Sequence, residues 1–315
     1  MVSHSDAAAR HALVTGLHGF TGEYVRDALV AAGYNVSDGA YANATAPTGP
    51  NPGKAKDSVA DNLAALDITS LEQCRQAIDA LRPTHIVHLA AISFVAHDDA
   101  LDMYRVNVLG TLNLLQACAD VGHCPDRILI ASSANVYGNA AGIVDESVVP
   151  APVNHYAASK LAMEHMVRTW FDRLPIVMTR PFNYTGRGQS ERFLVPKIVS
   201  HFVRKEARME LGNLDVARDF SDVRTVAQIY RALLESDAAP GEVVNVCSGH
   251  PYTLQQVVQL VREASGHDLE IRVNPAFVRQ NEVKMLAGSA RKLQRLVPGL
   301  QPIDLRDTIR WMVQP

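Results

Sequence analysis

We predict an α/β fold of the Rossmann type, with a doubly wound parallel sheet and a smaller α/β substrate-binding lobe, from three observations. Apolar strands alternate with amphipathic helices through residue 180, which is the pattern of βαβ units with right-handed crossovers. The first strand leads into a glycine-rich turn and then a helix. With 315 residues, 47% of them hydrophobic, the chain is long enough for one large domain and a smaller one.

The elements are expected in a regular order. The expected strands are residues 11–15, 86–90, 127–132, 176–180 and 242–247. The expected helices are residues 21–32, 70–81, 101–120, 155–173, 193–206, 222–236 and 253–265, followed by a small helical cap at 289–297 and 303–313. Residues 39–56 are rich in Gly, Ala, Pro and Asn, which predicts a loop.

The turn Thr15-Gly16-Leu17-His18-Gly19-Phe20-Thr21-Gly22 has the spacing of a dinucleotide-binding fingerprint. Gly16 permits the tight turn, Gly19 lets backbone N–H groups approach a pyrophosphate, and Gly22 lets the helix pack closely on the strand. The N-terminus of the following helix adds a partial positive charge. An ordinary glycine-rich turn is the alternative that this motif alone leaves open.

Tyr156 and Lys160 are four residues apart, so they share one face of a helix. The lysine charge favours the phenolate, which predicts a lowered pKa for Tyr156. Ser133 can bind the same substrate oxygen, and the three groups suit proton exchange at an alcohol or ketone while a hydride moves at its carbon. A Tyr-x-x-x-Lys pair alone is more often an exposed surface pair, and the glycine turn makes the catalytic interpretation stronger.

Active groups of a doubly wound sheet gather at the carboxyl ends of its strands. Ser133 ends one expected strand and Asn183 follows another, while the glycine turn follows the first. This convergence follows from the predicted topology.

Composition excludes several other classes of function. A net charge of −3 without a run of like charges argues against a nucleic-acid surface. Four cysteines without a CxxC pair, no apolar signal core and no apolar run of about 20 residues predict a cytoplasmic protein that does not span a membrane. His85 and His88 lie on opposite faces of a strand, so we expect no metal site.

Taken in order, these motifs resemble those of the extended short-chain dehydrogenase/reductase family, which modifies nucleotide-activated sugars. The resemblance runs from about residue 11 to residue 313. The motifs that carry it are the glycine turn, Asp67-Ile68, His88-Leu89-Ala90-Ala91, Asn107, Ser133, Tyr156 with Lys160, and Arg180-Pro181-Phe182-Asn183.

The resemblance implies a catalytic triad of Ser133, Tyr156 and Lys160, in which Lys160 also binds the nicotinamide ribose. The implied cofactor contacts are Gly16, His18, Gly19, Phe20, Thr21, Gly22, Asp67, Ile68, Leu89, Ala90, Ala91, Asn107, Tyr156, Lys160 and Pro181. The implied substrate contacts are Ser93, Ser133, Ala134, Asn135, Asn183, Val195, Arg218, Arg279 and Glu282.

The resemblance also implies a division of the chain and an assembly. Residues 1–181 with about 214–250 would form the dinucleotide-binding domain, and about 182–213 with 251–315 the substrate lobe. Helices 101–120 and 155–173 would pair with a second subunit as a four-helix bundle, which implies a homodimer. Leu101, Val108, Leu112 and Leu115 are expected to share one face of the first helix.

The family carries out epimerisation, 4,6-dehydration, decarboxylation and ketone reduction. Ala134 and Asn135 stand where its dehydratases place an Asp-Glu pair, and neither residue can cycle a proton, so dehydration is not expected. Residues 180–189, 216–223 and 278–283 are similar to segments of GDP-sugar enzymes. Arg218 would hold a diphosphate, and Arg279 with Glu282 a ribose.

The implied function is NAD(P)H-dependent reduction of the C4 ketone of a GDP-linked 4-keto-6-deoxy sugar, as in the formation of GDP-D-rhamnose. The alternatives are a nucleotide-sugar 4-epimerase with tightly bound NAD and a catalytically silent nucleotide-sensing protein. The choice between NAD and NADP stays open. The acid of NAD-specific relatives would fall near Ala40, Asp38 is two residues early, and Lys54 and Lys56 could reach a 2′-phosphate.

Overall fold

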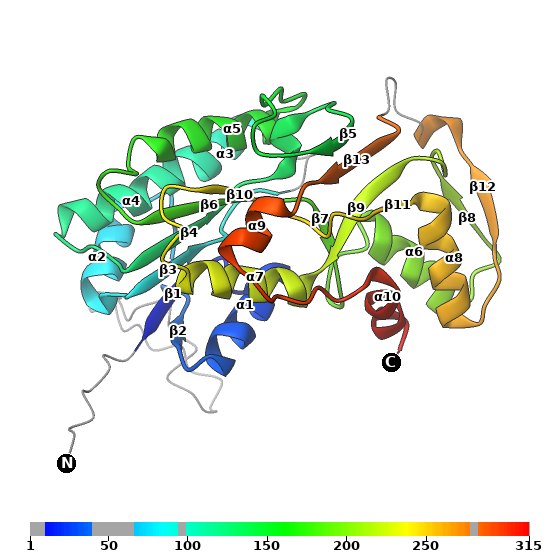
Figure 1. Ribbon diagram of the computed structural model, residues 1–315, viewed down its shortest axis with the longest axis horizontal. Helices are drawn as coiled ribbons and strands as arrows, with labels where there is room; N and C mark the ends of the chain where they lie inside the picture. Colours follow the sequence, from blue (N-terminus) through cyan, green and yellow to red (C-terminus); the bar gives the residue numbers. More distant parts are fainter. Residues whose placement is uncertain (1–9, 40–65, 94–98, 278–282, 315) are drawn as a thin grey trace, which may run out of the picture.

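The computed structural model describes residues 10–39, 66–93, 99–277 and 283–314, which form a larger and a smaller lobe (Figure 1). The elements of the larger lobe are β1 (His11–Thr15), α1 (Phe20–Ala31), β2 (Asn35–Ser37), α2 (Leu71–Leu81), β3 (His85–His88), α3 (Ala100–Tyr104), the π-helix η2 (Arg105–Gly110), α4 (Thr111–Asp120), β4 (Arg127–Ala131), the 3₁₀ turn η3 (Ala134–Tyr137), α5 (His155–Arg168), β6 (Ile176–Pro181), α7 (Val223–Glu235), β10 (Val243–Val246) and α9 (Arg291–Leu296).

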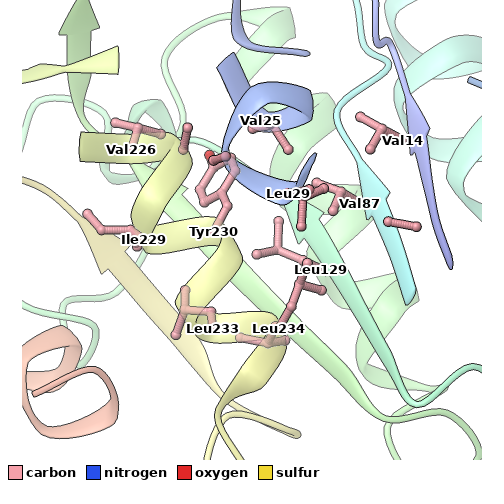
Figure 2. Close-up of a cluster of buried hydrophobic side chains, with 14 of the residues drawn as sticks. Val14, Val25, Leu29, Val87, Leu129, Val226, Ile229, Tyr230, Leu233 and Leu234 are labelled. Carbon is pink, nitrogen blue, oxygen red and sulfur yellow. The ribbon is translucent and has the colours of Figure 1, made fainter. Parts of the chain in front are cut away.

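Six strands of this lobe form one parallel sheet in the order β10-β6-β4-β3-β1-β2. Strand residues alternate between its two faces, so Val14 and Leu13 belong to different hydrophobic clusters. Helices α1 and α7 cover one face and α2, α4 and α5 the other. Figure 2 shows the first of these clusters, in which Leu29 of α1 and Tyr230 of α7 meet Val87 and Leu129 of the sheet.

The order of the strands defines where a ligand can bind. Strand β1 lies between β2 and β3, so the connections leaving β1 and β3 run in opposite directions along the sheet. A crevice at the carboxyl ends of the strands at such a switch point is the usual ligand site of doubly wound folds. The glycine turn, the segment after His88 and the Ser132-Ser133 pair all follow strands of this region.

The smaller lobe contains a second sheet, with the order β11-β9-β13-β5 and with β7 paired to β9. A two-stranded sheet of β12 and β8 and the helices α6, α8 and α10 complete it around a core of its own (Figure 1). Its elements are β5 (Gly142–Val144), β7 (Asn183–Thr185), α6 (Leu194–Val203), β8 (Arg208–Leu211), β9 (Ala217–Asp222), β11 (Pro251–Thr253), α8 (Leu254–Ser265), β12 (Glu270–Val273), the 3₁₀ turn η4 (Pro275–Phe277), β13 (Met285–Gly288) and α10 (Leu305–Val313).

Asp219 of β9 fastens the two lobes together. Its buried carboxylate accepts hydrogen bonds from the Ser248 backbone at 2.9 Å, the Ser248 hydroxyl at 2.7 Å and the Gly249 backbone at 2.8 Å. Ser248 and Gly249 follow β10 of the larger sheet, so this carboxylate fixes the end of that strand to the second sheet. Burial raises the pKa of Asp219.

The predicted fold class is confirmed. The expected helices and main strands are present with boundaries that shift by a few residues, and the helix predicted at 155–173 ends at Arg168. The predicted lobe boundaries stay a prediction. Strand β10 belongs to the larger sheet, and α7 and Leu293 of α9 pack against it, although residues 251–315 were assigned to the smaller lobe. Strands β5 and β9 belong to the second sheet, although residues 1–181 and about 214–250 were assigned to the dinucleotide-binding domain.

The prediction of one continuous helical face over residues 101–120 is wrong. A π-helical segment at 105–110 changes the number of residues per turn, so the positions of an ideal α-helix do not line up. Leu101 is 80% exposed, whereas Leu115 is completely buried. A homodimer through these helices stays a prediction.

In the ranges that the structure describes, no helix combines the length and the hydropathy needed to cross a bilayer. The same ranges contain no cluster of three or more His, Cys, Asp or Glu side chains that could hold a metal ion.

Candidate active site

The glycine turn has the geometry that a phosphate cradle requires. Gly16 has a φ of 75°, and a Cβ on it would lie 2.8 Å from the backbone nitrogen of Ala90. A Cβ on Gly22 would lie 2.3 Å from the carbonyl oxygen of Leu17. Helix α1 begins directly after Gly19 without a side-chain cap, so its first N–H groups are free to bind an anion. The residues present therefore fit the diphosphate of a dinucleotide.

The first residues of α1, which follow this turn, contact the smaller lobe. Phe20 stacks on Tyr184 of β7 with ring centroids 6.1 Å apart, and Thr21 Oγ1 lies 2.8 Å from the Tyr184 hydroxyl. The sequence did not single out Tyr184 for this role. Its contacts fix the smaller lobe against the start of α1.

A buried hydrogen-bond chain links β1, β3 and the π-helix beside the turn. Thr111 donates to the carbonyl of Asn107, so it accepts from His88 Nε2 at 2.9 Å. His88 Nδ1 then accepts from Thr15 Oγ1 at 2.7 Å. Burial, aided by the charge of Lys160, lowers the pKa of His88 to about 3, which keeps the imidazole neutral.

Asn107 is buried in η2 and ties three segments together. Its side chain accepts from Ile92 N at 2.9 Å and donates to the Ile92 carbonyl at 3.2 Å and to Ser159 Oγ at 3.0 Å. Ser159 in turn donates to the carbonyl of Tyr156. The predicted cofactor residue Asn107 thus joins the segment after β3 to the turn of α5 that carries Tyr156.

The structure brings Ser133, Tyr156 and Lys160 together at the carboxyl end of β4. Ser133 lies close enough to Tyr156 to lower the pKa of the phenol, against the larger effect of burial. Asn135 donates to the Ser133 hydroxyl oxygen from its backbone at 3.2 Å and from its side chain at 3.0 Å. Ser133 therefore accepts from Asn135 and presents its own hydrogen toward Tyr156.

The electrostatics of this group differ from the sequence prediction. Burial raises the pKa of Tyr156 to about 12, opposite in direction to the lowering that we predicted from Lys160. The Lys160 ammonium instead donates to the carbonyl of Ala131 at 2.8 Å. Burial lowers the pKa of Lys160 to about 8, with the Glu164 carboxylate opposing that shift. Tyr156 is consequently a protonated phenol at neutral pH.

A buried ionic network lies behind the triad, and the sequence analysis did not identify it. Glu164 accepts from Arg180 Nε at 2.9 Å and from Arg180 Nη2 at 2.6 Å, and also from Ser132 Oγ at 2.6 Å. Arg180 also donates to the Tyr137 hydroxyl at 3.0 Å, and Tyr137 donates to Asn245 at 2.7 Å. The one available signal was that Glu164 lies one helical turn after Lys160.

Asp38 lies directly after β2 and faces the glycine turn. Its Oδ2 is 2.9 Å from His18 Nε2. The residue expected at the adenosine ribose, Ala40, lies outside the described residues, as do Lys54 and Lys56. Asp38 is therefore the acidic side chain that the described part of the chain places beside the turn.

The remaining predicted cofactor residues are near the same edge of the sheet. Asp67 is exposed and accepts from the backbone and hydroxyl of Thr69, at 2.9 and 2.7 Å. Ile68 is buried against Gly110. Leu89, Ala90 and Ala91 follow β3, and Pro181 ends β6.

The predicted substrate residues are only partly gathered. Asn183 is exposed at the start of β7 and donates to the carbonyl of Asp219 at 3.2 Å. Arg218 donates to the carbonyls of Ala217 and Val283, at 2.9 and 2.8 Å. The remaining predicted substrate residues are Ser93, which is exposed, Val195, whose side chain is buried in the core of the smaller lobe, Ala134, which is buried beside Ser133, and Arg279 and Glu282, which lie outside the described residues.

A family model described as GDP-mannose 4,6 dehydratase matches residues 13–310. The chain belongs to this family. Relatives of this protein include GDP-6-deoxy-D-talose 4-dehydrogenase of Aggregatibacter actinomycetemcomitans, which is 39% identical over 72% of this chain and 78% of the relative. GDP-6-deoxy-D-mannose reductase of Pseudomonas aeruginosa is 34% identical over the same shares of the two chains.

Solved structures agree with the family assignment. A candidate epimerase from Burkholderia cenocepacia J2315 is 47% identical, with a TM-score of 0.84 over 96% of this chain and 97% of the other. RMD from Pseudomonas aeruginosa, complexed with NADPH, is 29% identical, with a TM-score of 0.81 over 97% of this chain and 96% of the other. The resemblance to short-chain dehydrogenases/reductases is confirmed, and the family member is an NAD(P)-dependent oxidoreductase.

Proposed function

We propose that this protein reduces the C4 ketone of a GDP-linked 4-keto-6-deoxy sugar. The observation that carries the proposal is the pairing of a protonated Tyr156 phenol with the Ser133 hydroxyl, with the amide of Asn135 beside them instead of an acid. Such a site can deliver a proton to a developing alkoxide. It lacks, at positions 134 and 135, the acid and base that elimination of water requires.

Each residue has a distinct task in this proposal. NAD(P)H, when bound, supplies a hydride for C4. Ser133 donates its hydrogen bond to the C4 oxygen as negative charge develops there, because Asn135 already occupies the acceptor side of its hydroxyl. Tyr156 protonates that oxygen. Lys160 binds the nicotinamide ribose, and its positive charge stabilises the phenolate that proton transfer leaves behind.

The names of two relatives support C4 redox chemistry on a GDP-linked 6-deoxy sugar. 6-Deoxy-D-talose and 6-deoxy-D-mannose differ only in the configuration at C4, so a single 4-ketone lies between them. We propose that ketone, GDP-4-keto-6-deoxy-D-mannose, as the substrate. The face of the ketone that receives the hydride then determines whether GDP-D-rhamnose or its C4 epimer forms.

The smaller lobe would hold the nucleotide. Arg218 presents a guanidinium for the diphosphate, and Asn183 presents an amide at the start of β7. We also propose the ribose contacts of Arg279 and Glu282. The assignments of Arg218 and Asn183 rest on their places in β9 and β7, and those of Arg279 and Glu282 rest on the chemistry of their side chains and on the sequence resemblance.

A second candidate function is C4 epimerisation, because the 47% identical structure from Burkholderia cenocepacia is described as a candidate epimerase. The two reactions use the cofactor differently. A reductase releases an oxidised cofactor after each turnover, whereas an epimerase reduces and reoxidises one that stays bound.

The test incubates the purified protein with GDP-4-keto-6-deoxy-D-mannose and either NADH or NADPH and follows absorbance loss at the nicotinamide band. We expect stoichiometric consumption of reduced cofactor and a GDP-6-deoxyhexose product. Three results together would reject the reductase in favour of the epimerase. Reduced cofactor would not be consumed, NAD would stay bound to the protein during gel filtration, and two GDP-sugars would interconvert.

A further inference from the structure

We propose that Glu164 is a positioning residue that holds Ser133 in place through Ser132 and supplies the negative charge that the buried cations Lys160 and Arg180 require. This inference rests on the proposed function, since it assigns Glu164 to the same site. Glu164 contacts neither of the predicted reacting atoms directly. It acts through the hydrogen bond from Ser132 and through the effect of its charge on Lys160.

The first argument is geometric. Helix α5 is joined to the end of β4 at two successive residues. Lys160 donates to the Ala131 carbonyl at 2.8 Å, and one helical turn later Glu164 accepts from the Ser132 hydroxyl at 2.6 Å. Ser133 is the next residue of that strand exit, so both contacts define where its hydroxyl stands relative to α5. Tyr156 lies on α5 one turn before Lys160 and is placed by the same join.

The second argument is the balance of charge. Only 2% of the Glu164 side chain and 3% of the Arg180 side chain are exposed, and Lys160 is buried as well. Two cations therefore share one buried carboxylate. A buried charge without a partner is strongly destabilising. Removing either Glu164 or Arg180 also changes the electrostatic potential at Lys160. The Arg180 guanidinium also donates to the Tyr137 hydroxyl, and this contact fixes the orientation of Arg180.

The other titratable groups around Lys160 do not supply that charge. His88 of β3 stays neutral because burial lowers its pKa to about 3. Tyr156 of α5 stays protonated because burial raises its pKa to about 12, and burial also raises the pKa of Tyr137. Burial lowers the pKa of Lys160 to about 8, and Glu164 is the group that opposes this shift. The charge state of Lys160 near neutral pH therefore depends on Glu164 and, through it, on Arg180.

This arrangement makes the two halves of the pair act in opposite directions. Glu164→Gln removes the negative charge and leaves Arg180 cationic, so Lys160 loses its proton at lower pH. Arg180→Gln leaves Glu164 unpaired, so Lys160 keeps its proton to higher pH. The double variant removes both charges and returns Lys160 toward its original behaviour. A purely structural role for the pair predicts loss of stability without this reversal of sign.

The experiment measures NADH and NADPH affinity by fluorescence from about pH 6 to about pH 10 and the pH profile of kcat for reduction. Glu164→Gln should move the alkaline midpoint of both pH profiles, cofactor affinity and kcat, down by about 1 pH unit. Arg180→Gln should move these midpoints up, and the double variant should lie between the two single variants. The affinity series does not depend on the sugar substrate, so it distinguishes a failure of this inference from a failure of the proposed function. Midpoints that stay fixed, or that move in the same direction in both single variants, would overturn the inference.

Ser132→Ala is the matched uncharged variant. It removes the hydrogen bond that places the strand exit but leaves the ion pair, so kcat should fall several-fold while KM and the alkaline midpoint stay unchanged. If Glu164→Gln does not fold, the double variant and Ser132→Ala carry the test. An unchanged kcat in Ser132→Ala, or a double variant whose midpoint matches neither the parent nor the expected intermediate value, would reject the positioning role.

Discussion

Asn135 donates two hydrogen bonds to the Ser133 hydroxyl oxygen, at 3.2 Å from its backbone and 3.0 Å from its side chain. These donors occupy the acceptor side of the hydroxyl, and the hydrogen of Ser133 is left to point at Tyr156 or at a substrate oxygen. Asn135, at the position where we expect dehydratases to carry an acid, therefore has a positive role, which is to orient Ser133 as a donor.

Asn135→Asp should lower kcat for ketone reduction more than Asn135→Ala does. A carboxylate at this position would accept the hydrogen of Ser133 and turn it away from the substrate, whereas alanine only removes one donor. Steady-state kinetics of both variants check the order. Equal kcat in Asn135→Asp and the parent would contradict this orientation of Ser133.

The parent should not dehydrate GDP-mannose. Detection of a 4-keto-6-deoxy product from GDP-mannose with the parent would contradict our interpretation of residues 134 and 135.

Tyr156→Phe should lower turnover by at least about a hundredfold, which is the usual effect of removing a general acid. Cofactor affinity should change little, because the phenol contributes its proton to the substrate oxygen. Stopped-flow reduction and fluorescence titration of NADPH measure the two quantities separately. Turnover near that of the parent would rule out Tyr156 as the proton donor.

Stability should fall as the pH drops from about 6.5, in part because of His88. The folded protein holds this imidazole neutral with a pKa of about 3, while the unfolded chain takes up a proton near the ordinary histidine pKa of 6.5. The unfolded state thus binds more protons between these values, and the free energy of unfolding decreases with falling pH by up to about 1.4 kcal/mol per unit from this residue.

Urea denaturation of the parent and His88→Asn at about pH 7 and about pH 5.5 isolates this contribution. The asparagine variant is expected to be less stable at the higher pH and to show the shallower dependence on pH. Identical slopes for the two proteins would mean that His88 is not the group responsible.

Several of these residues could be predicted from the sequence because their signals are local. The glycine spacing from Gly16 to Gly22 and the four-residue spacing of Tyr156 and Lys160 each determine geometry within one turn or one helix. The main strands were equally readable, since a run such as Ile128–Ile130 is buried on both faces. Order along the chain was then enough to place Ser133 at the same sheet edge.

Other features depend on tertiary contacts that no local pattern encodes. The direction of the Tyr156 pKa shift depends on how deeply α5 is buried, and the partnership of Glu164 with Arg180 joins a helix to a strand. Short strands such as β5 and β13 pair across more than a hundred residues, so three or four residues with weak propensity become strands only in the folded sheet. The interruption by η2 likewise misplaced the expected face of Leu101 and Leu115.

Asp38 should favour NADH over NADPH. Its carboxylate stands beside the glycine turn, where an acid can accept from a ribose 2′-hydroxyl and repel a 2′-phosphate. Asp38→Ser should raise the affinity for NADPH relative to NADH by about tenfold, measured by fluorescence titration. Asp27→Ser is the control, because Asp27 is 67% exposed in a surface pair with Arg26. A parent that binds NADPH more tightly than NADH would contradict this role of Asp38.

The most direct test of the central claim is to trace the transferred hydride. The protein is incubated with GDP-4-keto-6-deoxy-D-mannose and reduced nicotinamide cofactor that carries deuterium at both positions of C4 of the ring, and the product is examined by mass spectrometry and NMR. The proposed function predicts a GDP-6-deoxyhexose with one deuterium, located at C4 of the sugar, and an equal amount of oxidised cofactor released. A product without deuterium, or with deuterium at another carbon, would contradict reduction at C4 by this site.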